Sequence, residues 1–190
     1  MIKKLIPDGY YNSIYDIDYK ALYDKGIRLI LTDLDNTLIS YKEKEPSEKL
    51  IEFKNHLISL GFEIIIVSNS KKDRVNHFAN MLGTKFVKLS LKPLKRGINK
   101  AIKKVASKKY NKDEIILLGD QLMTDVFGGK RAKLKVFLIK AVDKSTDTFP
   151  TRFNRKLELH FLKKIRRKYK DLFDKNLKQY MEDAYGSEKM

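Results

Sequence analysis

Acidic, hydroxyl and basic side chains follow several short apolar runs of this 190-residue sequence. They are Asp33 and Asp35 after 29–32, Ser68 and Asn69 after 62–67, Asp120 and Asp125 after 115–118, and Lys92 a few residues beyond 86–89. Carboxylates that share one site repel one another unless a hard cation lies among them. Mg²⁺ prefers carboxylate, carbonyl and water oxygens, often beside a substrate phosphate. If the fold brings these runs together, the sequence predicts a Mg²⁺ site flanked by a lysine and a serine.

The apolar runs have the length and composition of strands buried on both faces of a parallel sheet. We predict five such strands, at 29–32, 62–67, 86–89, 115–118 and 136–139. Helical patterns alternate with them at 46–60, 71–82, 93–106 and 124–132, and Gly61 and Gly83 mark the ends of the first two. This alternation predicts an α/β three-layer sandwich with right-handed crossovers. Ligands bind at the carboxyl ends of such strands, where the polar residues stand.

Each polar residue also has an ordinary structural interpretation. Asp33 and Asp35 could cap a helix, Ser68 could belong to a simple turn, and Asp125 could cap the helix that begins near residue 124. Lys92 is distinguished from the many other lysines only by its place before a proline and between the other motifs. The three histidines, His56, His77 and His160, lack the spacing of metal ligands.

The run Asp33-Leu34-Asp35-Asn36-Thr37 resembles the DxDxT signature of the haloacid dehalogenase-like (HAD) phosphatase superfamily. The other superfamily motifs have counterparts in the same order: Ser68 in VSNS, Lys92 in KP, and Gly119-Asp120 with Asp125. LIPDGYYNSI near the start, GDQLMTDVFGG, and TRFNR near residue 151 resemble the capless YqeG branch. That branch includes enzymes that dephosphorylate phosphatidylglycerophosphate. The resemblance covers roughly residues 1–165.

The resemblance implies a mechanism with two catalytic aspartates. Asp33 would attack phosphorus and form an aspartyl-phosphate, which divides hydrolysis into two easier steps. Asp35 would protonate the leaving alkoxide and then take a proton from the attacking water. Mg²⁺ would bind the Asp33 side chain, the Asp35 carbonyl and Asp120, with Asp125 behind them or bound through water.

The resemblance also implies how phosphate would be held. Ser68 and Lys92 would bind the phosphoryl oxygens, Lys92 as a point charge. Asn69 would assist phosphate binding, and Thr37 would orient the loop after the first strand.

The distances between motifs predict an open site. Asp33 and Ser68 are 35 residues apart, and Ser68 and Lys92 are 24 apart. Neither gap has room for the cap domain with which many HAD phosphatases enclose small substrates. We therefore expect a substrate presented on a large surface, and phosphatidylglycerophosphate in a membrane is the leading candidate.

The chain carries a formal charge of +17, with 41 basic residues against 24 acidic ones. Such a charge attracts nucleic acid, anionic lipid or acidic substrates. Because most of the basic residues are lysines, the charge could instead reflect a lysine-rich amino-acid usage that has no role in binding. Nine of the basic residues lie in 152–170, beside one acid. We predict a catalytic core at 1–150 and a basic, amphipathic extension of one or two helices at 151–190.

The extension places apolar residues on one stripe and basic residues opposite. The stripe consists of Phe153, Leu157, Phe161, Leu162, Ile165, Tyr169, Leu172, Phe173 and Tyr180; the basic residues are Lys156, Lys163, Lys164, Arg167 and Lys170. Such a helix could lie on an anionic membrane. Alternatively, the stripe could pack on the sheet or on a second subunit and leave a solvated basic face.

Composition narrows the remaining possibilities. The chain has no Cys, which excludes disulfides and thiolate metal sites, and no apolar run approaches the roughly 18 residues that span a bilayer. We expect a cytoplasmic protein, with peripheral association at the inner membrane surface left open. Two alternatives to lipid phosphatase activity also stay open. One is a HAD phosphatase for a nucleotide, nucleic-acid end or phosphoprotein; the other is a non-enzymatic nucleic-acid- or ribosome-associated binding module.

Overall fold

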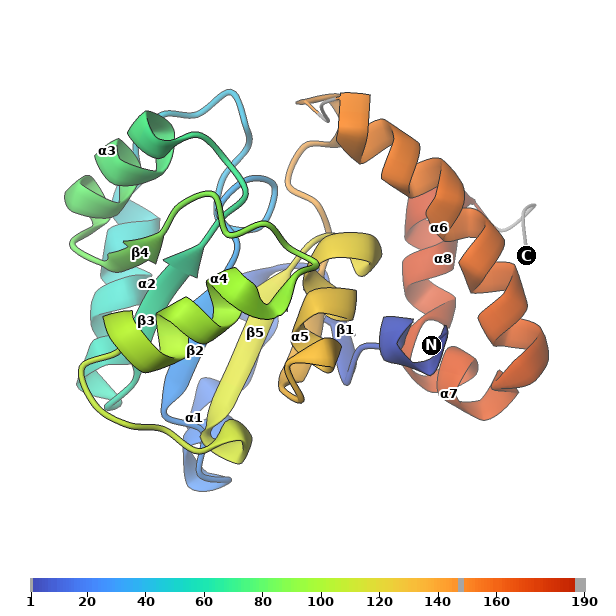
Figure 1. The fold of residues 1–190 in the computed structure, drawn as a ribbon, viewed down its shortest axis with the longest axis horizontal. Helices are drawn as coiled ribbons and strands as arrows, with labels where there is room; N and C mark the ends of the chain where they lie inside the picture. Colours follow the sequence, from blue (N-terminus) through green and yellow to red (C-terminus); the bar gives the residue numbers. More distant parts are fainter. Residues whose placement is uncertain (1, 147–148, 187–190) are drawn as a thin grey trace.

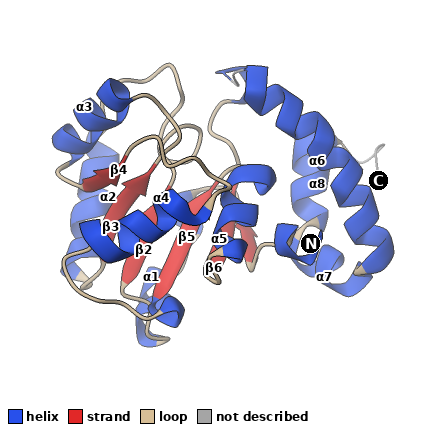
Figure 2. Cartoon of the chain, in the orientation of Figure 1, coloured by secondary structure: helices blue, strands red, loops and turns tan. Residues whose placement is uncertain are grey.

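The computed structural model shows an all-parallel sheet with helices on both faces. It describes residues 2–146 and 149–186, and it does not describe the side chains of residues 146 and 149–156. The strands are β1 (Gly9–Tyr11), β2 (Leu29–Thr32), β3 (Glu63–Val67), β4 (Lys85–Val87), β5 (Ile115–Gly119) and β6 (Lys135–Ile139). They lie in the order β1-β6-β5-β2-β3-β4 (Figures 1 and 2). The predicted α/β sandwich is confirmed, and its five predicted strands are β2 to β6.

The prediction of five strands is nevertheless short by one. β1 pairs in parallel with β6, with Gly9 opposite Phe137 and Tyr11 opposite Ile139. The segment Gly-Tyr-Tyr has neither a continuous apolar run nor an alternating pattern, and all three of its residues are only partly buried. Its strand conformation comes from pairing with a segment more than 120 residues away.

Two apolar layers hold the helices against the sheet. Successive strand residues point to opposite faces, so Leu29 and Leu31 belong to one buried cluster and Ile30 to the other. The first cluster lies under α4 (Lys95–Lys100) and α5 (Phe127–Arg131), and the second lies under α1 (Tyr19–Asp24), α2 (Glu48–Ser59) and α3 (Lys72–Leu82).

The predicted helices are present, with local changes. Ser47 caps α2 by accepting a hydrogen bond from the backbone N–H of Leu50 at 3.3 Å. α3 ends at Gly83, whose φ of 67° lies in the left-handed region that glycine tolerates. The helix predicted at 93–106 is α4 followed by a π-helical turn, Ala101–Val105, and the one predicted at 124–132 is a π-helical turn, Leu122–Val126, followed by α5.

The segments between the motifs contain no cap domain. Residues 33–62 form a loop and α2, and residues 68–92 form α3, β4 and a loop. Both segments are described throughout. The carboxyl ends of β2, β3 and β5 are therefore not enclosed by an inserted domain.

The C-terminal segment, as far as residue 186, forms three helices, where one or two were predicted. They are α6 (Phe149–Lys168), α7 (Lys170–Asn176) and α8 (Lys178–Tyr185). The backbone leaves the helical region at Tyr169 (φ −137°, ψ 56°) and at Leu177 (φ −133°, ψ −16°). Among the helices of the described ranges, none is both long enough and apolar enough to cross a membrane.

The apolar stripe of these helices packs on the core of the same chain. Leu162, Ile165, Phe173 and Tyr180 are buried in the cluster that also contains Leu29. Leu157, by contrast, is 38% exposed. The side chains of Phe153 and Lys156 lie outside those described. Of the two interpretations of the stripe, packing on the sheet is therefore the one observed.

Candidate active site

Asp33 lies at the end of the central strand β2, and its backbone is fixed there. Its N–H donates to the carbonyl of Leu118 at 2.9 Å, and the hydroxyl of Thr32 donates to its carbonyl at 2.9 Å. Asn36, with φ 60°, turns the chain sharply after Asp35. Because a turn and not a helix follows β2, the interpretation of the two aspartates as helix caps is excluded.

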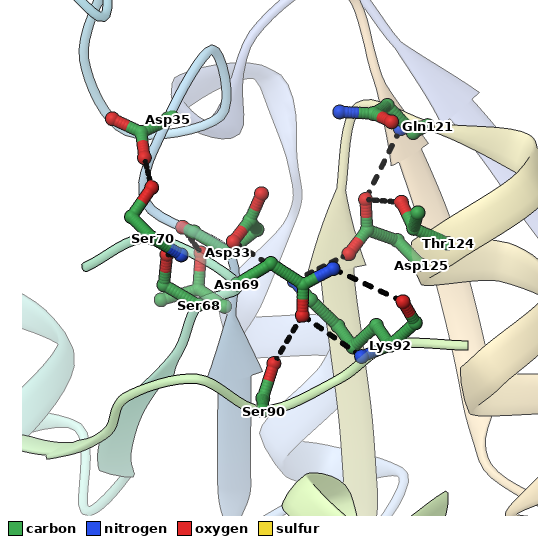
Figure 3. A network of polar contacts seen from close by, with 11 residues as sticks. Asp33, Asp35, Ser68, Asn69, Ser70, Ser90, Lys92, Gln121, Thr124 and Asp125 are labelled. Atoms are coloured by element: carbon green, nitrogen blue, oxygen red, sulfur yellow. Dashed lines mark hydrogen bonds and ion pairs between the residues drawn. The ribbon is translucent and has the colours of Figure 1, made fainter. Parts of the chain in front are cut away.

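Lys92 joins two of the predicted carboxylates (Figure 3). Its Nζ lies 2.8 Å from Oδ1 of Asp33 and 2.6 Å from Oδ1 of Asp125. The lysine side chain is only 2% exposed, and Asp125 is fully buried. Burial alone would lower the pKa of Lys92, but the charges of Asp125 and Asp33 outweigh it and raise the pKa. Lys92 is therefore a fixed positive charge.

The cluster contains more negative than positive charge. Asp33, Asp120 and Asp125 each place a carboxylate oxygen within 4.8 Å of the others, and all three residues are buried. Burial, together with the charge of Asp125, raises the pKa of Asp33 to about 7, although Lys92 opposes the shift. The single ammonium group does not balance the charge of three carboxylates, so the cluster can bind a further cation. A set of oxygen donors fits a hard divalent ion.

Gly119 and the π-helical turn place Asp125 in this cluster. A Cβ at Gly119 would collide with the Asp125 carboxylate, so only glycine allows that close approach. Oδ2 of Asp125 accepts hydrogen bonds from the Gln121 N–H at 3.2 Å and the Thr124 hydroxyl at 3.1 Å. Asp125 thus does more than cap a helix, since its other oxygen binds Lys92.

The carboxylate of Asp35 points away from this cluster. It accepts a short hydrogen bond from the Ser70 hydroxyl (Figure 3) and lies 2.7 Å from Nε of Arg74. The same guanidinium donates to the carbonyls of Glu43 at 2.8 Å and Ser40 at 3.2 Å. Arg74 therefore ties the first turn of α3 to the loop that carries Asp35.

Asn69 fixes the backbone of residues 90–92 and does not point its amide at the carboxylates. Its Oδ1 accepts hydrogen bonds from the Ser90 hydroxyl and the Lys92 N–H, both at 2.8 Å, and its Nδ2 donates to the Lys92 carbonyl at 3.0 Å. These contacts fix the backbone from which the Lys92 side chain extends (Figure 3). A direct role for Asn69 in phosphate binding stays a prediction.

Ser68 and Thr37 are buried at the same edge of the sheet. The Ser68 hydroxyl accepts a hydrogen bond from the Ser70 N–H at 3.0 Å, at the end of β3. Thr37 lies in the turn after β2, where its N–H faces the carbonyl of Leu34 at 3.4 Å. Every predicted site residue therefore lies at the carboxyl edge, but their side chains have different surroundings.

Sequence reasoning missed several residues that shape the site. Four of them are Ser70, Arg74, Ser90 and Thr124, each of which contacts a predicted residue. Arg74 could have been identified, since it lies in the first turn of the helix after the second motif. The contact of Ser90 with Asn69 depends on a loop conformation for which the sequence has no signal.

Comparisons with known proteins identify the family. The family model described as "Mitochondrial PGP phosphatase" matches residues 2–143. The chain belongs to this phosphatase family. The chain is 36% identical over 169 residues to the probable phosphatase YqeG of Bacillus subtilis (strain 168). The alignment covers 88% of this chain and 96% of that protein. The chain is thus a HAD-type phosphatase without a cap, a phosphoric monoester hydrolase, and the non-enzymatic alternative is set aside.

Solved structures show a more distant likeness. The cobalt-bound deoxy-D-mannose-octulosonate 8-phosphate phosphatase (YrbI) of Haemophilus influenzae has a TM-score of 0.48 and 14% identity, over 60% of this chain and 69% of that one. A putative HAD superfamily (subfamily III A) hydrolase of Legionella pneumophila has a TM-score of 0.43 and 17% identity, over 76% and 91%.

Proposed function

We propose that this phosphatase is Mg²⁺-dependent, acts through an aspartyl-phosphate, and hydrolyses phosphatidylglycerophosphate at a membrane surface. The buried group of Asp33, Asp120 and Asp125 around Lys92 carries the chemical part of the proposal. The description of the matching family supports the substrate. So does the lack of an inserted domain over the carboxyl edge in the segments 33–62 and 68–92.

The reaction divides between two aspartates. A carboxylate oxygen of Asp33 bonds to phosphorus while the bond from phosphorus to the substrate oxygen breaks, and Asp35 donates a proton to the departing alkoxide. Asp35 then takes a proton from a water molecule that attacks the aspartyl-phosphate, which releases phosphate and restores Asp33.

The other residues hold the phosphoryl group and the metal. Lys92 and Ser68 bind the phosphoryl oxygens, on a frame fixed by Asn69 and Thr37. Mg²⁺ would be held by the side chains of Asp33 and Asp120 and the carbonyl of Asp35, with Asp125 behind them. When bound, it would offset the negative charge of the carboxylates and of the phosphoryl group.

A membrane-borne substrate suits the charge of the chain. The division into a core at 1–150 and a basic extension at 151–190 stays part of the proposal. Four basic residues of the extension, Lys163, Arg166, Arg167 and Lys170, line a hollow in the surface. Each basic residue near an anionic membrane contributes about 1 kcal/mol of attraction, so this group would help to bring the enzyme to its substrate.

Phosphate release from vesicles containing phosphatidylglycerophosphate tests the proposal. The purified protein should release phosphate with Mg²⁺ and stop when the metal is chelated. Asp33→Asn should abolish release, whereas Asp113→Asn, in an exposed turn before β5, should not.

A panel of other substrates separates chemistry from specificity. It should include a soluble aryl phosphate, a nucleotide, a 3′-phosphorylated oligonucleotide and a phosphopeptide. If the protein hydrolyses one of these but is inert on the lipid, the substrate assignment fails and the chemistry stands. If metal removal has no effect on any substrate, the metal assignment fails.

A further inference from the structure

Three leucines are exposed within six residues of the loop that carries Lys92. Leu89, Leu91 and Leu94 are 54%, 52% and 51% exposed. Burial alternates along this loop: Ser90 and Lys92 are buried, whereas Leu89 before them, Leu91 between them and Leu94 after them are exposed. We call residues 88–94 the leucine loop. One side of it binds the catalytic carboxylates, and the other presents an apolar surface.

The backbone of the leucine loop is unusual for its sequence. Leu89 and Leu91 have φ of 45° and 55°, in the left-handed region where a side chain with a Cβ is disfavoured. Glycine or asparagine would fit both positions with less strain. Large apolar side chains in a strained, water-exposed conformation favour a functional role for this surface.

Basic residues surround the leucine loop. Lys88 begins the loop. Desolvation and the charges of Lys72 and Lys100 lower the Lys88 pKa, and the opposing charge of Asp73 does not cancel the shift. Lys95 and Arg96 follow in the first turn of α4, which contains no acidic residue. A helix dipole favours acidic residues at that end, so the dipole does not account for these cations.

We propose that the leucine loop inserts into the surface of an anionic bilayer and brings Lys92 and its carboxylates to the membrane. The inference deepens the proposed function and rests on it. Apolar side chains surrounded by lysines match the interfacial region of such a membrane, where leucines reach the acyl boundary and ammonium groups contact the headgroups. Lys92 stands between two of the inserting leucines, so a lipid headgroup would meet the site directly.

A bilayer fits this surface better than a second copy of the chain. Two copies that each carry +17 repel one another, and the basic residues around the loop would face their counterparts. Three side chains also provide far less area than the roughly 800 Å² per partner of a stable protein interface. Shallow insertion into lipid needs only a few apolar side chains.

A triple variant of the leucine loop tests the inference. Asn at 89 and 91 suits the left-handed backbone, and Ser at 94 suits the N-cap of α4, so Leu89→Asn/Leu91→Asn/Leu94→Ser should fold. The matched control is Ile58→Gln/Met81→Gln, because both residues are similarly exposed but lie in the last turns of α2 and α3, at the opposite edge. Sedimentation with vesicles of phosphatidylglycerol and phosphatidylcholine, without substrate, measures binding; hydrolysis of a soluble aryl phosphate measures chemistry.

The triple variant should bind vesicles at least about tenfold more weakly and keep its rate on the aryl phosphate, and the control should keep both. Unchanged vesicle binding by the triple variant would overturn the inference. Failure of the wild type to bind vesicles would also overturn the inference. The proposed function would still stand in that case if the wild type hydrolyses the lipid in detergent. Self-association of the wild type that the triple variant loses, without vesicle binding, would assign the surface to a second copy.

If the triple variant also loses activity on the aryl phosphate, a tryptophan reporter tests whether the leucine loop inserts into the membrane. The chain has no Trp, so Leu94→Trp introduces a unique fluorophore in the loop, and Met81→Trp provides the control. Vesicles should shift the emission of Leu94→Trp to the blue and leave that of Met81→Trp unchanged. Equal responses of the two variants would contradict insertion through the leucine loop.

Discussion

Asp33 and Asp35 are two residues apart but have different electrostatic surroundings. Asp33 contacts Lys92 and belongs to the buried carboxylate group, whereas Asp35 contacts Ser70 and Arg74 on the side of α3. A nucleophile and a general acid need such separation, because one has to stay charged while the other exchanges protons. Arg74 is therefore a positioning residue for Asp35.

Replacing Arg74 should slow the reaction without preventing substrate binding. Arg74→Ala removes the ion pair with Asp35 and both loop contacts of the guanidinium, so Asp35 loses its orientation. The kcat on a soluble phosphoester should therefore fall about 10- to 100-fold, with little change in KM. Arg74→Lys should recover part of the rate. Arg96→Ala, an exposed arginine in α4, is the control. An unchanged kcat in Arg74→Ala would show that Asp35 needs no such support.

Gly119→Ala should act on the metal through Asp125. The added Cβ would displace the Asp125 carboxylate, which also binds Lys92. Loss of a residue that supports metal ligands weakens metal affinity about 10- to 100-fold, so the Mg²⁺ concentration for half-maximal activity should rise by that factor. The measurement is a Mg²⁺ titration of phosphate release, with circular dichroism to establish that the variant is folded. Wild-type Mg²⁺ dependence in the folded variant would exclude this role for Gly119.

At the scale of elements, the sequence predicted the strands that carry the site. Leu29–Thr32 and Ile115–Gly119 are buried throughout and mainly apolar, and such a strand leaves little ambiguity about where the polar residues after it lie. Asp33 and Asp120 could be placed for that reason. The orientation of Asp35 could not, because it depends on Arg74, which approaches from another helix.

The missed elements lack local signals. β1 has three residues and depends on β6, and the helix breaks at Tyr169 and Leu177 occur without proline or glycine. Leu177 and Phe173 are buried, so tertiary packing sets the path of the chain there against its helical pattern. The sequence around Tyr169 and Leu177 therefore does not predict that the helices end there.

Glu63, at the start of β3, should make stability depend on pH. Burial alone would raise the pKa of Glu63, but hydrogen bonds from Lys85, Ser107 and Tyr110 outweigh burial and lower it. The folded chain therefore favours the carboxylate. This contribution to the free energy of unfolding is complete above the unfolded pKa, about 4.3, and is lost as pH falls through the lower folded pKa.

Glu63→Gln tests this contribution. Urea unfolding should show a destabilised variant at pH 7 and a smaller difference from the wild type at pH 3. Glu52→Gln, an exposed glutamate of α2, should show little difference at either pH. A gap between wild type and Glu63→Gln that stays constant with pH would mean that ionisation of Glu63 does not contribute.

At the scale of the whole molecule, the helices of the basic extension pack against the sheet. Leu162 and Ile165 of α6 are fully buried beside residues of the sheet, and Tyr180 of α8 packs its ring on Tyr10 of β1. The cations of 163–170 are therefore on the exposed side of helices that stabilise the fold.

Truncating a buried residue of α6 should destabilise the protein as a core substitution does. Leu162→Ala should lower the free energy of unfolding by about 2–5 kcal/mol, the range for large-to-small changes in cores. Leu157→Ala, on the same helix but 38% exposed, should cost much less. Equal, small effects in denaturant titrations would indicate that the extension is only loosely attached.

The pairing of β1 with β6, covered by the last helices, has a consequence for synthesis. Leu5 and Ile6 share their buried cluster with Leu162 and Met181, so this segment, which is translated before α6 and α8, completes its contacts only after those helices have been made. Until then, the nascent chain exposes these apolar side chains, which favours aggregation. Production of this enzyme should therefore depend on chaperones that hold the segment around Leu5 and Ile6 until α6 to α8 have been translated.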